Sequence, residues 1–410
     1  MEPPSVDHVA DGYIFTWSNP DIEITVDRIY TERHQTHSEI AIMSHLPGQE
    51  GHIHRASFNL SSSQARRSLV KLLEDRNIPV DWTHAIEQVC VLTLDLLREG
   101  EAVIEVGMDE DEAGAEAFRL WPILPEGEPT ILYGDGGVGK SYLACFFSVL
   151  VTLPLEAAGF KPTYGNVLYL DYETGPARIN KRIRLLSQGL IGSKLVTIYY
   201  QRRFQPLSDS VPELQRIVHK GKINMVVVDS VDKASGGDAE KQEVATRLFM
   251  GLRALGVTSL LIGHVTKEQS SPRSGKTPFG SAFWRNNARA AWEVRNSQEP
   301  NSNTMTVGLY HRKANDGLLL KPIGLKITFS DDEVTVKRTD LKAVPMLVAG
   351  LPISDQILSI LRPWPVTVAE LVDALQTGVG TVRVMLNRLQ ERGLIRNLSR
   401  GTWGLATHDS

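Results

Sequence analysis

A glycine-rich segment at residues 134–141 constrains the fold of this chain more than any other feature. It reads GDGGVGKS and fits the phosphate-binding pattern G-x-x-x-x-G-K-[ST]. In such a loop the backbone amides converge on phosphates, Lys140 reaches the β and γ phosphates, and the Ser141 hydroxyl ligates Mg²⁺. An apolar strand precedes the loop and an apolar helix follows it, as the motif requires. The segment predicts a site for ATP and Mg²⁺ formed by Gly134, Asp135, Gly136, Gly137, Val138, Gly139, Lys140, Ser141 and Tyr142.

Two acids stand at the ends of apolar runs further along the chain. Asp229 follows the valine run 226–228 and is expected to hold the Mg²⁺ ion through water. Glu173 ends the run 168–173 and is expected to act as the base, or to position water, for attack on the γ phosphate. An Asp at a strand end is common in α/β proteins, and Glu173 can equally cap a helix ahead of Gly175 and Pro176. Both assignments therefore depend on the loop.

Short apolar runs separated by helical stretches dominate the middle of the chain from residue 130. These runs are TILYG, NVLYLDYE, KLVTIYY, INMVVVDS and TSLLIGH. Continuous apolar strands are typical of sheets covered on both faces. The pattern predicts an α/β domain with a parallel sheet.

The flanking regions have different patterns, and 410 residues suffice for two or three domains. Alternating apolar positions over residues 13–60 predict an antiparallel sheet, and two helices are expected after it, from the serines at 61–63 and from Asp81. An acidic, small-residue stretch at 108–117, followed by prolines 122, 125 and 129, predicts a linker. After residue 348, three helical segments and two short strands suggest a winged helix. We expect an N-terminal α+β accessory domain with its linker (1–115), an ATPase domain (116–348) and a winged-helix domain (349–410).

The order of the motifs resembles that of RecA-fold P-loop ATPases and, more narrowly, of the plasmid RepA-type hexameric replicative helicases. The resemblance covers roughly residues 120–330. It rests on the phosphate loop, Glu173, Asp229 and the strand that ends in GHVTK at 263–267. It implies a RecA-like parallel-sheet core with Glu173 as catalytic base, Asp229 as an acid of the metal sphere and His264 as a sensor that couples the γ phosphate to DNA-contacting loops. A histidine taken alone is more often structural.

In that family ATP lies between subunits, and a neighbour supplies positive charge to the transition state. The segment 279–289, FGSAFWRNNAR, is similar to the family segment that carries such an arginine; Arg289 has the matching spacing, and Arg285 is a less favoured substitute. Lys313 matches the K-x-R or K-x-N element at the family's subunit interface. Asn315, however, stands where DnaB-type ring helicases carry arginine, which favours Arg289. Both cations can also be explained as solvated surface groups or as members of internal salt bridges.

Basic residues with a possible DNA role lie in two places. The segments after Asp229 and after His264 are flexible by composition, and in RecA-like rings the corresponding loops line the central channel. We therefore expect backbone contacts with single-stranded DNA from Lys233, Lys267, Arg273 and Lys276, although plain surface loops explain these residues equally well.

The C-terminal segment 379–392 is the expected recognition helix of the winged helix, with Arg383 and Arg388 facing outward. Winged helices also dock proteins, so the partner of this domain stays open. In the N-terminal region, His52 and His54 lack the cysteines or clustered acids that would complete a metal site.

Overall composition excludes some classes of protein. The net charge of −4 argues against a wholly basic nucleic-acid coat but not against local basic patches. No apolar run is long enough to span a membrane, the N-terminus lacks a signal-peptide pattern, and Cys90 and Cys145 lie in apolar helical patterns as buried thiols. We expect a cytoplasmic protein.

Taken together, the motifs predict a homo-oligomeric ring, hexameric by analogy, that couples ATP hydrolysis to translocation on or unwinding of DNA, with replication proteins as further partners. One alternative is an ATP-dependent DNA-binding regulator or loader that switches assembly without unwinding. A small-molecule P-loop kinase is a third, but no lid or acceptor pocket is recognisable in the sequence.

Overall fold

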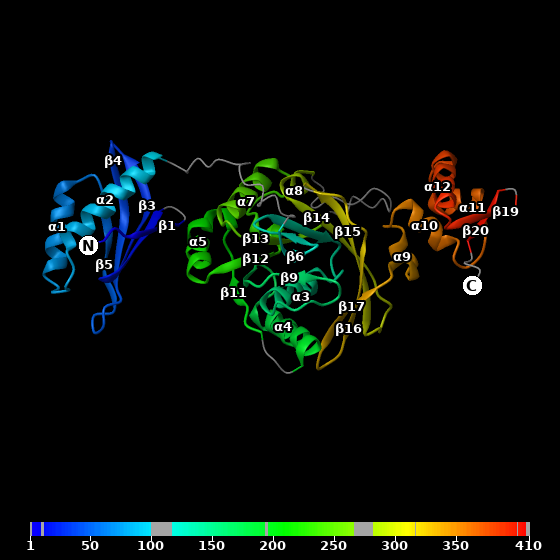
Figure 1. Ribbon diagram of the computed structural model, residues 1–410, viewed down its shortest axis with the longest axis horizontal. Helices are drawn as coiled ribbons and strands as arrows, with labels where there is room; N and C mark the ends of the chain where they lie inside the picture. Colours follow the sequence, from blue (N-terminus) through cyan, green and yellow to red (C-terminus); the bar gives the residue numbers. More distant parts are fainter. Residues whose placement is uncertain are drawn as a thin grey trace. The chain divides into compact units, whose positions relative to one another are not determined.

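The computed structural model describes residues 2–9, 12–99, 117–192, 196–265, 282–315, 317–399 and 401–406 (Figure 1). The chain divides into two compact units. The first comprises Met1–Ala115 together with Ser210–Lys222, and the second comprises Glu116–Asp209 together with Ile223–Ser410.

The first unit is built on an antiparallel sheet in the order β1-β2-β3-β4-β5. The strands are β1 (Ser5–Val9), β2 (Gly12–Ser18), β3 (Asp21–Glu32), β4 (Gln35–Ser44) and β5 (Gly51–Asn59). Apolar side chains alternate along them, so one face, with Phe15, Ile24 and Ile42, is fully buried in a core shared with α1 (Ser63–Glu74) and α2 (Trp82–Glu99). Helix α1 begins after Ser62, whose hydroxyl accepts a hydrogen bond from the Ala65 amide. The antiparallel sheet and both helices agree with the sequence prediction. Helix α5 (Val211–Lys220) is grouped with this unit.

A nine-stranded mixed sheet forms the centre of the second unit, in the order β11-β10-β12-β13-β8-β14-β15-β16-β17. Its strands are β8 (Pro129–Gly134), β10 (Asn166–Asp171), β11 (Tyr199–Arg202), β12 (Ile223–Asp229), β13 (Thr258–His264), β14 (Ala290–Ser297), β15 (Thr304–Ala314), β16 (Ile323–Phe329) and β17 (Val334–Thr339). The strands from β11 to β14 in this order run parallel, whereas β14 through β17 pair antiparallel. A small sheet, ordered β7-β6-β9, consists of β6 (Phe118–Trp121), β7 (Leu124–Pro125) and β9 (Lys161–Pro162).

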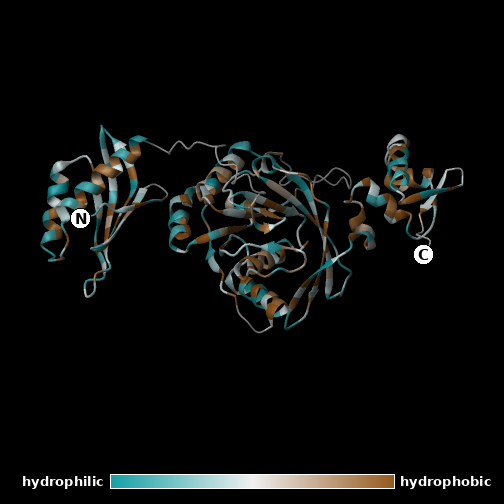
Figure 2. Ribbon diagram, viewed as in Figure 1, coloured by the Kyte–Doolittle hydropathy of each residue, from teal (hydrophilic) through white to brown (hydrophobic). Residues whose placement is uncertain are grey.

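Helices cover the large sheet, and the helix that follows the phosphate loop is the most deeply buried of them. The helices are α3 (Lys140–Thr152), α4 (Pro176–Ile191), α6 (Val231–Ala234), α7 (Gln242–Ala254) and α8 (Ala282–Asn287), with a short 3₁₀ turn, η2 (Leu207–Ser210). Every residue from Leu143 to Val151 in α3 is buried, which explains why this helix is apolar all round. Figure 2 shows hydrophobic residues concentrated where α3 and the inner strands lie. The core includes side chains of α3, α4 and the sheet.

The sequence predicts a parallel sheet, and the structure adds an antiparallel part to it. The sequence analysis found β8, β10, β12 and β13 because each is a continuous apolar run, and it missed β14, which pairs parallel with β8. Strands β15 and β17 begin instead with a short alternation; at residues 304–307 of β15, Met305 and Val307 are buried while the two threonines are partly exposed. The sheet is therefore mixed, although the α/β class and its mostly parallel centre are confirmed.

A short segment leads from β17 to the C-terminal elements. It contains η3 (Leu341–Ala343) and α9 (Pro345–Val348). The Tyr310 hydroxyl of β15 donates to the Leu347 carbonyl at 2.6 Å, and Tyr310 shares a small core with Leu341, Val348 and Leu351. Tyr310 of β15, which is buried, thus attaches this segment to the nine-stranded sheet.

Three helices and a three-stranded sheet complete the chain. They are α10 (Ile353–Ile360), β18 (Val366–Thr367), α11 (Val368–Leu375), α12 (Val379–Glu391), β19 (Ile395–Ser399) and β20 (Thr402–Leu405), with the sheet ordered β18-β20-β19. Val382, Leu386 and Leu389 of α12 are buried in their own core, as expected from the sequence. The identification of these elements as a winged-helix domain, and the three domain boundaries, stay predictions.

Both cysteines are free and buried, Cys90 in α2 and Cys145 in α3. Burial raises the pKa of each thiol to about 12. Among the helices that the structure describes, none combines the length and apolarity needed to cross a membrane. Within the same described ranges, no three His, Cys, Asp or Glu side chains are grouped to hold a metal ion.

Candidate functional site

The carboxyl ends of four neighbouring parallel strands meet at one edge of the large sheet. Asp171 pairs with Asp229, and His264 pairs with Gly134, which opens the phosphate loop. We call this the nucleotide edge; it comprises the loop at 134–141, the turn at 171–175, Asp229 with the following α6, and His264. Open parallel sheets bind ligands at the carboxyl ends of their strands.

A cavity of about 560 Å³ lies at the nucleotide edge. Its lining consists of Gly137, Gly139, Lys140, Ser141, Tyr142, Glu173, Thr174, Arg178, Arg182, Lys233, Ile262 and His264. The structure therefore brings Lys140, Glu173 and His264 together, three residues that are far apart in the sequence.

Two glycines give the phosphate loop its shape. Gly137 and Gly139 have φ angles of +77° and +95°, a backbone conformation that residues with a Cβ rarely adopt. A Cβ on Gly139 would also lie 2.7 Å from the Met305 methyl carbon. These positions require glycine because the backbone must turn sharply into α3.

Lys140 is held by its own loop. Its ammonium nitrogen donates to the carbonyls of Gly134 (2.8 Å) and Asp135 (2.7 Å) and lies 3.4 Å from His264 Nδ1. Burial lowers the pKa of Lys140 to about 8, although nearby acids, led by Asp229, oppose that shift. The lysine thus stands at the centre of the edge in a position to exchange carbonyl contacts for phosphate contacts.

Asp229 and Ser141 form the oxygen pair expected at a magnesium site. Asp229 is buried, and its Oδ2 accepts a hydrogen bond from the Tyr169 hydroxyl at 2.6 Å. Burial raises the pKa of this carboxyl group, and hydrogen bonds from Tyr169 and Ser141 act in the opposite direction. A buried carboxylate beside a hydroxyl at a phosphate loop offers the hard oxygen ligands that Mg²⁺ prefers, so these residues fit the ion.

Glu173 lines the same cavity as Lys140. Its Oε2 atom is 4.0 Å from His264 Nε2, and its side chain is 42% exposed. His264 therefore stands between the loop lysine and the acid expected to act on water. This placement is compatible with the base and sensor roles, which stay proposals.

The turn that carries Glu173 is built by a neighbouring acid that the sequence analysis did not single out. Asp171 Oδ1 accepts the amides of Glu173 (2.9 Å) and Thr174 (2.8 Å), and Oδ2 accepts the amide of Gly175 (2.5 Å) and the Tyr200 hydroxyl (2.8 Å). Burial raises the pKa of Asp171, but these hydrogen bonds outweigh it and leave the pKa below its ordinary value. Asp171 therefore fixes the position of Glu173.

Two arginines of α4 also lie in the cavity and were missed. Arg178 and Arg182 are four residues apart and share one helix face. The Arg182 guanidinium carbon is 5.0 Å from the Tyr142 ring centroid, and its Nη1 is buried without a hydrogen-bond partner among the residues that the structure describes. The i, i+4 spacing directly after Glu173 was the available signal. These side chains add positive charge where the phosphates are expected.

Arg289 and Lys313 lie at the opposite end of the strands. The Arg289 amide donates to the Pro129 carbonyl, at the start of β8, and Ala314 pairs with Ala290 at the start of β14. We call this the amino edge. Lys313 donates to the carbonyls of Asn286 (2.7 Å) and Ala288 (2.6 Å).

Positive charges converge at the amino edge. Burial lowers the pKa of Lys313, and the charges of Arg285, Arg289 and Arg253 lower it further. Arg285, the substitute for Arg289, therefore also lies near Lys313. The cations expected to act on the ATP of a neighbouring subunit therefore lie close together at the amino edge.

The structure describes only three of the six residues expected to contact DNA, and these three lie in two different places. Lys233 lies in α6 and lines the nucleotide cavity. Arg383 and Arg388 are exposed on α12. Lys267, Arg273 and Lys276 lie outside the described residues. All six assignments stay predictions.

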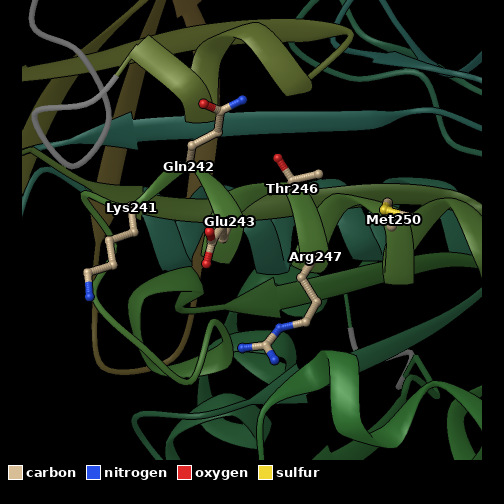
Figure 3. Close-up of a pocket in the computed structure, with 6 residues that line it drawn as sticks. All are labelled: Lys241, Gln242, Glu243, Thr246, Arg247 and Met250. Atoms are coloured by element: carbon tan, nitrogen blue, oxygen red, sulfur yellow. The ribbon is translucent and has the colours of Figure 1, made fainter.

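A second cavity, of about 840 Å³, lies along α7, where Lys241, Gln242, Glu243, Thr246, Arg247 and Met250 line it (Figure 3). All its described lining residues come from the start and outer face of one helix. It contains no loop glycines and no paired acids, and we assign it no function.

Comparison with known protein families agrees with the α/β fold of this part of the chain. Residues 115–270 match the family described as an AAA domain (AAA_25). This part of the chain is a RecA-like P-loop ATPase domain, and its match includes Lys140, Glu173, Asp229 and His264. A search of curated proteins finds no match to the chain.

Proposed function

We propose that the protein is a ring-forming ATPase that couples ATP hydrolysis to translocation on or unwinding of DNA, as the RepA-type helicases do. The observation that carries the proposal is the division of the expected catalytic charges between two edges of the sheet. Lys140, Glu173 and Asp229 lie at one edge and Arg289 at the other. A complete site would then require two subunits.

At the nucleotide edge each residue has a distinct task. Lys140 exchanges its loop carbonyls for the β and γ phosphate oxygens, and the loop amides hold the phosphates. Ser141 and Asp229 would hold Mg²⁺, which neutralises charge on the phosphates. Glu173 accepts a proton from water as the water oxygen attacks the γ phosphorus, and the bond to the β-phosphate oxygen breaks. His264, whose ring lies 3.4 Å from Lys140 Nζ and 4.0 Å from Glu173 Oε2, would act as the sensor of the γ phosphate.

Arg289 cannot serve the ATP of its own chain. Strand β8 runs from Pro129, beside Arg289, to Gly134 at the phosphate loop, and at about 3.3 Å per residue this separation is about 17 Å. An arginine side chain spans far less than that distance. If Arg289 stabilises the transition state, it does so in a neighbouring subunit.

Hydrolysis tests the site directly. Lys140→Ala is expected to lower ATP turnover by at least 100-fold, because the lysine contacts the transferred phosphate; this corresponds to about 2.7 kcal/mol of lost transition-state stabilisation. Arg67→Ala, at an exposed position of α1, is the control and should leave turnover unchanged. Unchanged turnover in Lys140→Ala would contradict the proposal.

Subunit mixing tests the divided site. Arg289→Ala and Glu173→Gln are each expected to abolish most turnover. In a mixture, the intact Arg289 of one variant meets the intact Glu173 of the other, so part of the activity should return. Absence of any recovery, with both variants assembled, would argue against a trans role for Arg289.

An ATP-dependent DNA-binding regulator or loader is the second candidate, favoured by the exposed Arg383 and Arg388 on α12, which suit a DNA-docking surface without strand separation. Unwinding of a forked duplex distinguishes it from a helicase. Stimulation of hydrolysis by single-stranded DNA would exclude the small-molecule kinase interpretation.

A further inference from the structure

The loop between β15 and β16 presents three consecutive leucines to solvent. Leu318, Leu319 and Leu320 are 88%, 61% and 37% exposed. Single exposed leucines are common on protein surfaces, but a run of three is unfavourable in water unless another surface covers it. We call Leu318–320 the leucine loop.

The leucine loop is anchored to the sheet. The Leu320 amide donates to His311 Nδ1 at 3.1 Å, and the His311 ring stacks on the buried Trp292 with centroids 4.2 Å apart. Burial lowers the pKa of His311 to about 4, so the ring is neutral and its Nδ1 accepts this bond at physiological pH. A half-buried histidine stacked on a buried tryptophan therefore holds the Leu320 end of the leucine loop in place.

The loop lies at the amino edge. It follows Ala314, which pairs with Ala290 at the start of β14, and it is five residues beyond Lys313. The cations that surround Lys313 are thus next to the leucine loop in the chain and at the same edge of the sheet.

The nucleotide edge carries an exposed apolar side chain of its own. Phe204 is 82% exposed, and the Arg202 guanidinium carbon lies 5.1 Å from its ring centroid. The Arg203 amide donates to the Asp171 carbonyl at 2.9 Å, which places Phe204 beside the turn that carries Glu173. Each edge therefore combines an apolar surface with part of the expected catalytic machinery.

We propose that the leucine loop is a docking surface for a second copy of this chain, and that it packs at that copy's nucleotide edge beside Phe204. The inference rests on the proposed function, because it specifies the contact that would join the divided site. The two surfaces lie at opposite ends of parallel strands and cannot cover each other within one chain. A head-to-tail contact covers both and brings the cations of the amino edge toward the phosphates of bound ATP.

The strength of the contact between the amino edge of one copy and the nucleotide edge of the next should depend on whether ATP is bound. The nucleotide edge carries both acids, among them Glu173, Asp171 and Asp229, and cations, namely Lys140, Arg178, Arg182 and Lys233, whereas ATP with Mg²⁺ adds net negative charge. The amino edge should therefore bind a neighbour more tightly when ATP is present.

Sedimentation of the full chain tests the docking surface. The double variant Leu318→Ser/Leu319→Ser should require at least tenfold more protein to assemble with Mg²⁺ and a nonhydrolysable ATP analogue. Its monomer should bind a fluorescent ATP analogue as the wild type does. Leu398→Ser, at a 46% exposed leucine of β19, is the matched control and should assemble normally.

Crosslinking tests the pairing. Leu319→Cys and Phe204→Cys should crosslink through a short bismaleimide only when the two single variants are mixed, because the contact joins different edges; the native cysteines are buried and do not compete. Crosslinking of Leu319→Cys alone, equal to that of the mixture, would overturn the head-to-tail contact. Normal assembly of the double serine variant would overturn the inference while leaving the proposed function intact. A wild type that hydrolyses no ATP and never assembles would overturn both.

Discussion

Lys140 carries the positive charge expected to bind the phosphates, but burial of its side chain disfavours the charged form. Burial lowers its pKa to about 8 in the unbound protein, well below the ordinary lysine value of about 10.4. Bound phosphates favour the charged ammonium and raise the pKa again. Nucleotide binding is therefore linked to protonation of this one side chain.

We expect ATP binding to take up a proton between about pH 8 and pH 10, approaching one proton near pH 9, and the affinity to fall as the pH rises through that window. Below pH 8 the lysine is already charged, so uptake at this residue disappears. Calorimetry in two buffers of different ionisation enthalpy measures the effect. Lys140→Arg is the control, since a guanidinium stays charged; equal uptake by both proteins would contradict the assignment.

Asp171 acts on Glu173 through the backbone and is a positioning residue. Asp171→Asn exchanges one carboxylate oxygen for an amide donor that faces the Gly175 amide or the Glu173 amide, so the turn must shift. We expect kcat to fall by about 10- to 100-fold, equivalent to about 1.4–2.7 kcal/mol, while KM for ATP changes less than about threefold. Steady-state hydrolysis measures both constants.

Tyr200→Phe is the graded control for Asp171→Asn. It removes only the phenol hydrogen bond to Asp171 and should lower kcat less than Asp171→Asn does. A rise in KM with unchanged kcat in Asp171→Asn would show that the turn serves binding and not the orientation of Glu173.

Close packing of Gly350 against the Tyr310 ring holds the segment around α9 in place. A Cβ at Gly350 would lie 2.6 Å from the Tyr310 ring, whereas a Cβ at Gly380, within α12, would meet nothing within 4 Å. The first glycine is needed for packing and the second is not.

Gly350→Ala should therefore destabilise the protein by about 1–3 kcal/mol, since the added methyl overpacks a buried site. Gly380→Ala should stabilise α12 by about 0.5–1 kcal/mol because alanine favours the helix. Thermal unfolding measures both, with Tm moving in opposite directions. A Tm of Gly350→Ala equal to that of wild type would contradict the tight contact.

Sequence reasoning succeeded for elements whose pattern is local. The phosphate loop, α3 and the apolar strands were predicted because glycine spacing and continuous apolar runs determine them. Strand β14 and the antiparallel strands after it were not predicted. Charged residues interrupt the apolar run of β14, the alternation in the later strands is short, and their neighbours in the sheet are set by tertiary pairing. Arg182 and Asp171 were missed for a related reason: their roles depend on Tyr142 and Tyr200, which only the fold brings near.

At the scale of the whole molecule, the exposed arginines of α12 can be separated from the ATPase site. Arg383→Ala/Arg388→Ala should weaken binding to DNA and lower the slope of log affinity against log salt by up to about 2, because each arginine would neutralise one phosphate. Hydrolysis without DNA should stay unchanged. Fluorescence anisotropy over a series of salt concentrations measures the slope, and an unaltered slope would favour a protein-docking role for these elements.

The reactivity of the two buried cysteines reports the opening of the core around each of them. Cys90 belongs to the first compact unit and Cys145 to the second, where it lies in the helix directly behind the phosphate loop. A thiol reagent can reach each sulfur only when the surrounding core opens, and the raised pKa slows reaction further. Thiol labelling followed by mass spectrometry would therefore time the opening of each unit separately, in the wild-type protein and without an engineered cysteine.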